Sequence, residues 1–317
     1  MHKGAVRGAL PQGNPVPQAF ADRDTGHLRR FLSFGKESSL LSPFTEIVEA
    51  FRDVCSKGNL MSAARIHEKM AHGFGHRRLR ERLEHLDVPT YVIGDVHGRY
   101  DLLSALERRI VADAAGLPGR KLIIMLGDYI DRGPASAQVV GRLMASPPNG
   151  FDRICLTGNH EMEMLAYIDG EISLDDWVAL GGDATLASYG ADILTLRQQY
   201  PSEKKLDTFL RTWLPDDHIN FLRRLPIMLD TPQALFVHAG IDPDRSIADQ
   251  QDDDLVFIRS RFYDSAQPLP KLIVHGHTPI RQAEVSGLRL NLDTGAFHTG
   301  RLSAARLWQG RVHITST

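Results

Sequence analysis

Five short polar motifs, each following an apolar run, constrain this 317-residue chain more than any other feature. From residue 88 onward, short aliphatic runs alternate with segments of helical periodicity, which is typical of α/β organisation. In an open α/β sheet, ligands bind beyond the carboxyl ends of the strands. Five such motifs at that position therefore predict one convergent site. The motifs are GDVHG (94–98), GDYIDRG (127–133), GNHE (158–161), HAG (238–240) and HGHT (275–278).

The elements that carry these motifs follow from the hydrophobic pattern. Runs of four to six mainly apolar residues predict strands, and apolar positions at helical spacing predict helices. The predicted helices cover 101–114 and 135–145. The predicted strands cover 90–93, 121–126, 153–156, 234–237, 271–274, 288–292, 303–308 and 311–315.

The residue types in the motifs indicate metal chemistry. Asp95 and His97 are two residues apart, so both side chains point the same way as a strand runs out into its loop. Aspartate, asparagine and histidine together offer mixed oxygen and nitrogen ligands, which suit Mn, Fe, Zn or Co better than Ca. The two cysteines, Cys55 and Cys155, lie 100 positions apart, which excludes a disulfide framework and a CxxC zinc site.

Each motif alone has an ordinary structural explanation. The D-x-H triplet could be a turn carboxylate beside a surface histidine, GDxxDRG a loop closed by an Asp–Arg pair, and GNH a tight turn. A single histidine after an apolar strand is more often a hydrogen-bonded core residue than a ligand. These explanations would need five independent coincidences, all after strands, so we favour the functional interpretation.

Taken in order, the five motifs resemble the phosphoprotein phosphatase family of calcineurin-like dinuclear metallophosphoesterases, in its bacterial serine/threonine branch. The resemblance covers about residues 88–317. It implies an α/β/β/α sandwich of two mixed sheets flanked by helices, with two divalent metal ions at the sheet edge. Mn is the expected metal, with Fe and Zn as alternatives. A hydroxide shared by the two ions would attack phosphorus in line.

The resemblance also implies a role for each motif residue. Asp128 would bridge the two metal ions. The first ion would be held by Asp95, His97 and Asp128, and the second by Asp128, Asn159, His238 and His277.

His160, directly after Asn159, would serve as the general acid for the leaving group. Asp131 would orient that imidazole and keep it protonated, as a triad carboxylate does. Arg132 and Arg259 would bind phosphate oxygens, with Arg261 as the alternative to Arg259.

Three further features are interpreted more modestly. We expect His275 and Asp293 to be structural or to support the ligands rather than to bind metal. The segment GGDATLASYG (181–190) also resembles the bacterial branch. It could border the substrate groove or form a turn packed on the core, and the sequence leaves both possibilities open.

The leading functional hypothesis is a serine/threonine protein phosphatase, a phosphomonoester hydrolase whose partner would be a phosphoprotein or phosphopeptide. The alternative is a hydrolase of dinucleoside polyphosphates or of another small phosphate ester. That branch usually has alanine at the position of Asp131 and tryptophan at that of Thr278, so both residues favour the phosphatase. A phosphate-binding pseudoenzyme is a third hypothesis, which the intact ligand set and His160 oppose.

Composition sets the remaining expectations. The net charge of -2 supplies no overall field for nucleic acid or an anionic membrane, so neither partner is expected. The longest aliphatic run, 122–126, is far below the ~18 residues of a membrane span, and the N-terminus lacks the apolar core of a signal peptide. We therefore expect a cytoplasmic protein, and the sequence leaves its oligomeric state open.

The domain expectation has three parts. Prolines and glycines through residues 1–41 predict a loosely structured lead, and residues 42–87 are predicted as a helical extension. Residues 88–317 are predicted as the catalytic domain, with a helical insertion at about 165–230.

Overall fold

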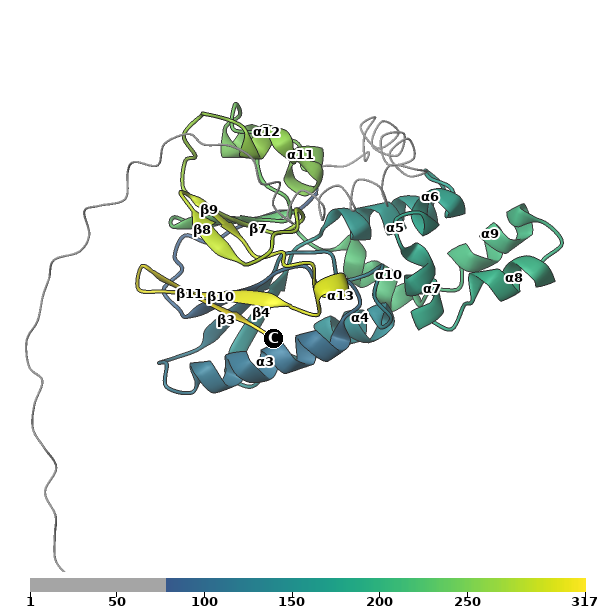
Figure 1. The fold of residues 1–317 in the computed structure, drawn as a ribbon, viewed down its shortest axis with the longest axis horizontal. Coiled ribbons are helices and arrows are strands. Elements are labelled where there is room, and N and C mark those ends of the chain that lie inside the picture. Colours follow the sequence, from purple (N-terminus) through teal and green to yellow (C-terminus); the bar gives the residue numbers. More distant parts are fainter. Residues whose placement is uncertain (1–77) are drawn as a thin grey trace, which may run out of the picture. The chain divides into compact units, whose positions relative to one another are not determined.

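A computed structural model describes residues 78–317, which form two mixed β-sheets flanked by helices (Figure 1). The first sheet has the order β11–β10–β2–β3–β4, and the second has the order β1–β5–β6–β7–β9–β8. The predicted α/β/β/α sandwich is confirmed. The first sheet contains β2 (Thr90–Ile93), β3 (Lys121–Met125), β4 (Phe151–Cys155), β10 (Ser303–Trp308) and β11 (Arg311–Ser316). The second contains β1 (Arg80–Arg82), β5 (Met228–Asp230), β6 (Ala234–Val237), β7 (Leu272–His275), β8 (Glu284–Ser286) and β9 (Arg289–Asn291).

The central strands are buried on both faces, and their side chains alternate between two cores. In β2, Tyr91 and Ile93 pack with the helices, whereas Val92 packs between the sheets. In β6, Leu235 and Val237 face the helical core and Phe236 faces the other sheet. This double burial explains why these strands are continuous apolar runs rather than alternating ones.

Helices cover the outer face of each sheet (Figure 1). The first sheet is covered by α3 (Tyr100–Ala114) and α4 (Ser136–Met144), and the second by α11 (Asp252–Phe257) and α12 (Ser260–Tyr263). No helix among residues 78–317 is long and apolar enough to cross a membrane. The short α13 (Ala296–Thr299) precedes β10, and a 3-10 turn spans Ile247–Asp249.

The predicted helical insertion is present between the GNHE and HAG motifs. Helix α5 (Asn159–Asp169) begins within GNHE, and α8 and α9 lie farthest from the sheets in Figure 1. The insertion contains α6 (Leu174–Val178), α7 (Gly182–Ser188), α8 (Ile193–Gln199), α9 (Glu203–Arg211) and α10 (Asp216–Arg223).

The predicted helical extension over 42–87 is wrong at its described end, because Arg80–Arg82 forms strand β1. This strand pairs in parallel with β5, and the Leu83 amide continues the pairing to the Asp230 carbonyl at 2.9 Å. The Arg80 guanidinium donates to Asp252 at 2.5 Å. Tertiary pairing therefore overrides the helical preference of an Arg- and Glu-rich segment. The rest of that prediction, and the 1–41 lead, lie outside the described residues.

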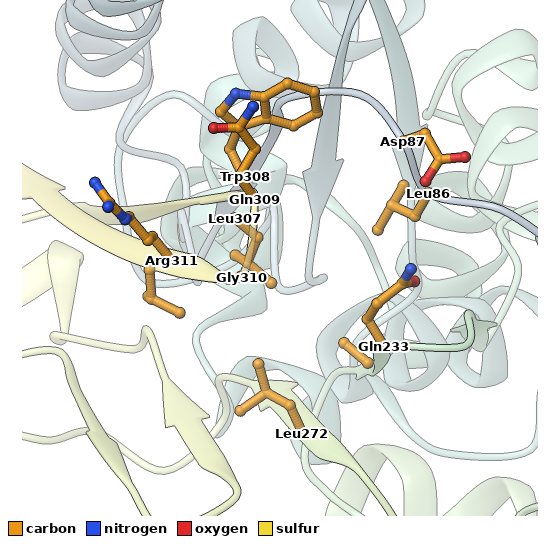
Figure 2. A pocket seen from close by; sticks show the side chains of 11 residues that line it. Leu86, Asp87, Gln233, Leu272, Leu307, Trp308, Gln309, Gly310 and Arg311 are labelled. Atoms are coloured by element: carbon orange, nitrogen blue, oxygen red, sulfur yellow. The ribbon is translucent and has the colours of Figure 1, made fainter.

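Figure 2 shows the lining of a largely apolar cavity of about 470 Å³. Its walls include Ala234 and Leu272, the first residues of β6 and β7, whereas the HAG and HGHT motifs lie at the other ends of these strands. Leu307 and Trp308 close it at the end of β10. The cavity is therefore separate from the convergent site.

Candidate active site

The motif loops leave the carboxyl ends of the strands with an unusual backbone. Among the described residues, six other than glycine have positive φ, and five of these belong to the motifs. The sixth, Gln309, lies in the β10–β11 turn. Positive φ costs of order 1–3 kcal/mol for such residues and persists where the surroundings enforce it, most often at functional sites. The five are His97 (43°), Asp128 (52°), Asp131 (67°), Arg132 (69°) and His277 (65°).

Asp128 lies at the centre of the site, between two histidines. Its Oδ2 is 3.4 Å from His97 Nε2, and its Oδ1 is 3.4 Å from His238 Nε2. Its carboxylate belongs to two groups of buried residues, and in each group one ligand atom per residue lies within 4.8 Å of the others. One group adds His97 and His160, and the other adds His238 and His277. Asp128 is thus the residue that the two groups share, and its bridging role stays a prediction.

Hydrogen bonds to backbone carbonyls orient two of these histidines. His97 Nδ1 donates to the Ile130 carbonyl at 2.9 Å, and His238 Nδ1 donates to the Leu126 carbonyl at 3.1 Å. Each bond turns Nε2 toward Asp128, as in metal sites, where the second nitrogen of a ligating histidine is held by an outer partner.

Charge within the site favours a cation beside Asp128. Burial, followed by the charge of Arg132, holds the pKa of His97 well below its usual range, so this imidazole is neutral and can donate a lone pair. Burial also disfavours the charged form of His238, but the Asp128 carboxylate outweighs it and raises the pKa to about 9. As a metal ligand, His238 would have to give up that proton, because only the neutral imidazole offers a lone pair.

Asn159 and His277 complete the second donor group. Asn159 Oδ1 lies 2.9 Å from His277 Nδ1 and 3.1 Å from His238 Nε2. The Asn159 amide nitrogen points the other way and donates to Glu163 Oε2 at 3.3 Å. The amide oxygen thus faces the histidines, which is the orientation that a ligand would require.

Asp95 lies beside these residues but outside both groups of clustered donors. Its Oδ2 accepts the His277 amide at 3.0 Å. Burial, followed by the charge of Asp293, holds the Asp95 pKa well above its usual range. Within the described residues, the buried Asp95 Oδ1 and His277 Nε2 have no hydrogen-bond partner. Uncompensated buried donors of this kind fit divalent cations with mixed oxygen and nitrogen ligands.

His160 and Asp131 form a buried pair next to the donor groups. His160 Nδ1 lies 2.7 Å from Asp131 Oδ2, as the sequence predicts. Burial, followed by the charge of Arg132, lowers the His160 pKa to about 3. Burial raises the Asp131 pKa to about 7. Without bound metal or phosphate, both shifts favour the neutral forms of the two groups. That Asp131 keeps His160 protonated stays a prediction. A bound phosphate anion would act in the opposite direction and favour the imidazolium.

The two predicted phosphate-binding arginines are both exposed and lie at the site. Arg132 Nη1 is 2.9 Å from His97 Nε2, and its guanidinium lies 5.1 Å from the centre of the Phe297 ring. Desolvation lowers the pKa of Arg259. The charge of Arg132 lowers it further, and the charge of Asp128 raises it. The alternative, Arg261, instead forms an ion pair with Asp254.

Three further expectations concern His275, Asp293 and the segment 181–190. His275 lies outside both donor groups and packs edge-on against the Phe262 ring, with 5.1 Å between centres. Its buried Nε2 has no hydrogen-bond partner among the described residues, so its structural role stays a prediction. Asp293 is buried, and its Oδ1 accepts the Gly295 amide at 2.8 Å. The segment 181–190 contains α7, and Thr185 within it donates to Asp131 at 2.6 Å.

Sequence reasoning missed four residues that organise the site. Glu161 accepts the backbone amides of Asp128 and Tyr129 at 2.9 and 2.8 Å and so holds the GDYIDRG loop. Its place in GNHE could have indicated a role. Thr185 lies in the segment 181–190, whose resemblance to the bacterial branch was the available signal. Glu163 and Trp177 gave no such signal, because Asn159 lies one helical turn from Glu163 and Asp131 lies in another segment from Trp177.

A family model for calcineurin-like phosphoesterases matches residues 88–299, which is more than half of the chain. The chain belongs to the calcineurin-like phosphoesterases. This membership confirms the calcineurin-like resemblance and places the chain among hydrolases of a metal-dependent family.

The chain has low sequence identity to two bis(5'-nucleosyl)-tetraphosphatases. The chain is 26% identical over 235 residues to the asymmetrical bis(5'-nucleosyl)-tetraphosphatase PrpE of Bacillus thuringiensis, covering 68% of this chain and 89% of that protein. It is 30% identical over 156 residues to a symmetrical bis(5'-nucleosyl)-tetraphosphatase of Klebsiella pneumoniae, covering 49% of this chain and 44% of that protein.

One crystal structure with a similar fold is that of a suggested diadenosine tetraphosphatase. The similarity has a TM-score of 0.52 at 20% identity and covers 76% of this chain and 98% of the other. At this identity the likeness concerns the fold alone.

Proposed function

We propose that this chain is a metal-dependent phosphohydrolase whose two cations are held on either side of Asp128. The observation that supports this most directly is the Asp128 carboxylate, each of whose oxygens lies 3.4 Å from a different histidine. When bound, the two ions would lower the pKa of a water molecule and take up charge on phosphoryl oxygens. Mn is our first candidate, with Fe and Zn next, because the donors are mixed oxygen and nitrogen.

The chain's own residues have separate tasks in this proposal. Asp95, His97 and Asp128 would hold one ion, and Arg132 and Arg259 would bind oxygens of the substrate phosphate. His160 gives its Nε2 proton to the departing oxygen and regains a proton from water. The second ion is held by Asp128, Asn159, His238 and His277. Arg132 Nη1 lies 2.9 Å from His97 Nε2. With His97 engaged as a ligand, this guanidinium would be available to bind phosphate oxygens.

Dinucleoside polyphosphates are the first substrate class that we propose. The support comes from the relatives named above, which are both bis(5'-nucleosyl)-tetraphosphatases. Cleavage of a phosphoanhydride releases a nucleotide whose departing oxygen is weakly basic. Such a leaving group has little need of a general acid.

Phosphoserine and phosphothreonine in proteins are the second substrate class, and a specific contact favours them. The buried pair of His160 and Asp131, joined at 2.7 Å, is positioned to protonate a leaving group. A serine alkoxide is strongly basic and benefits most from such a proton. A phosphoprotein or phosphopeptide would then be the natural partner.

A parallel activity measurement separates the two classes. Enzyme stripped of metal and reloaded with Mn is assayed for kcat/KM on diadenosine tetraphosphate and on phosphoserine peptides. The first proposal predicts a preference of at least about tenfold for the dinucleotide, and the opposite preference would replace it with the second. Hydrolysis of neither substrate nor of p-nitrophenyl phosphate by the metal-loaded enzyme would refute the phosphohydrolase proposal.

A further inference from the structure

Two side chains of the helical insertion donate to the carboxylate of Asp131. The hydroxyl of Thr185, in α7, donates to Asp131 Oδ1 at 2.6 Å. The indole N–H of Trp177, in α6, donates to Asp131 Oδ2 at 3.2 Å. That second oxygen is also the partner of His160 Nδ1. The insertion thus reaches the His160–Asp131 pair from 46 and 54 positions away along the chain.

Thr185 forms two hydrogen bonds with Asp131. Besides donating to the carboxylate, its hydroxyl oxygen accepts the Asp131 backbone amide at 2.8 Å. Ser136 Oγ lies 3.1 Å from the same hydroxyl. Asp131, Ser136, Thr185 and Trp177 are all fully buried, so water does not compete for these bonds. The left-handed backbone of Asp131, with φ 67°, is therefore enforced by specific partners.

Packing fixes Trp177 as firmly as hydrogen bonding fixes Thr185. Its ring stacks on Tyr167 with 5.0 Å between centres and an angle of 23°. The backbone of Gly182 also packs closely against the indole, since a Cβ at this position would lie only 2.5 Å from the ring. The donor N–H consequently has little freedom to leave Asp131.

We infer that α6 and α7 act as a clamp on the leaving-group acid, with Thr185 and Trp177 as positioning residues that fix the Asp131 carboxylate and, through it, the His160 ring. This inference rests on the proposed role of His160 as acid. It gives the insertion a task in catalysis in addition to any contact with substrate. Without the clamp the carboxylate can rotate, and His160 samples orientations from which its proton does not reach the departing oxygen.

The test compares leaving groups of different basicity within one substrate class. Phenyl phosphate releases a more basic oxygen than p-nitrophenyl phosphate, so it depends more on the acid. We expect Thr185→Val to lose about tenfold in kcat/KM on phenyl phosphate, a fraction of the 10²–10⁴-fold typical of general acid catalysis. The loss on p-nitrophenyl phosphate should be less than about twofold. Thr185→Ser keeps the hydroxyl and should remain within about threefold of wild type on both.

A second variant provides an independent test if Thr185→Val does not fold. Trp177→Phe retains a ring for stacking on Tyr167 but removes the N–H, and it should show the same selective loss at smaller size. Metal content and Tm are matched for every variant. Equal fractional losses on the two substrates, or Thr185→Ser as damaging as Thr185→Val, would overturn the clamp and leave only a packing role.

His160→Ala, measured in parallel, separates failure of the inference from failure of the proposed function. A selective loss in His160→Ala without one in Thr185→Val would overturn only the clamp. Equal losses on both substrates in His160→Ala would remove the acid assignment itself. In the double variant, Thr185→Val should add almost nothing to His160→Ala, because residues that act as one unit are not additive.

Discussion

The two halves of the site differ in whether their buried polar atoms have hydrogen-bond partners within the protein. In the acid half, formed by Asp131, His160, Trp177 and Thr185, both carboxylate oxygens have hydrogen-bond partners within the protein. In the cation half, formed by the six predicted ligands, Asp95 Oδ1 and His277 Nε2 are buried without a partner among the described residues. The acid half is therefore organised by the chain itself, whereas the cation half has the donors and negative charge to accept an external positive charge.

The largest effect should follow from removing the shared carboxylate of the cation half. Asp128→Asn loses the charge between His97 and His238, and we expect kcat/KM to fall by at least about 10³-fold on every substrate. Bound metal, measured by elemental analysis after gel filtration, should fall with it. Two ions per chain with near-normal turnover would contradict the central position of Asp128.

The next effect should come from the acid half and leave metal binding intact. His160→Ala should lose about 10²-fold or more on phosphoserine peptides but much less on p-nitrophenyl phosphate, whose leaving group needs little protonation. Metal content provides the control and should equal that of wild type. A loss of metal in this variant would mean that His160, which lies within 4.8 Å of His97 and Asp128, belongs to the cation half instead.

The smallest effect concerns the orientation of a single amide. Glu163 is buried and accepts from Asn159 Nδ2 at 3.3 Å, which keeps the Asn159 oxygen toward the histidines. Glu163→Met removes the acceptor at similar volume and should weaken the binding of one ion by about tenfold, the lower range for outer partners of metal ligands. Glu163→Gln retains an acceptor oxygen and serves as the matched variant.

Calorimetric titration of Mn into the metal-free protein measures this affinity. Equal affinities for Glu163→Met and wild type would show that Asn159 needs no support. Equal losses in Glu163→Met and Glu163→Gln would point to the charge of Glu163 rather than to its acceptor oxygen.

The sequence predicted the central strands and the motif loops because both are local signals, but it missed the three-residue strands β5 and β8. The predicted strands at 90–93, 234–237 and 303–308 coincide with β2, β6 and β10, since each is a short apolar run bounded by polar residues. The ligand candidates meet because the strands that carry them end at one edge.

Other features depend on contacts that no local pattern encodes. Strand β1 has a charged Arg-Glu-Arg sequence that favours a helix in isolation, and it becomes a strand only by pairing with β5 more than 140 positions away. The clamp residues Trp177 and Thr185 resemble ordinary helical residues until the insertion folds back on Asp131. The pKa values of His160 and Asp131 follow from burial, which their adjacency to a motif does not reveal.

A titration of metal-stripped enzyme shows whether turnover depends on metal ions. Protein freed of metal by exhaustive chelation is reloaded stepwise with Mn, and p-nitrophenyl phosphate turnover is plotted against bound ions per chain. We expect less than about one hundredth of full activity without metal and full recovery at two ions per chain. Undiminished turnover by protein shown to be metal-free would contradict this expectation.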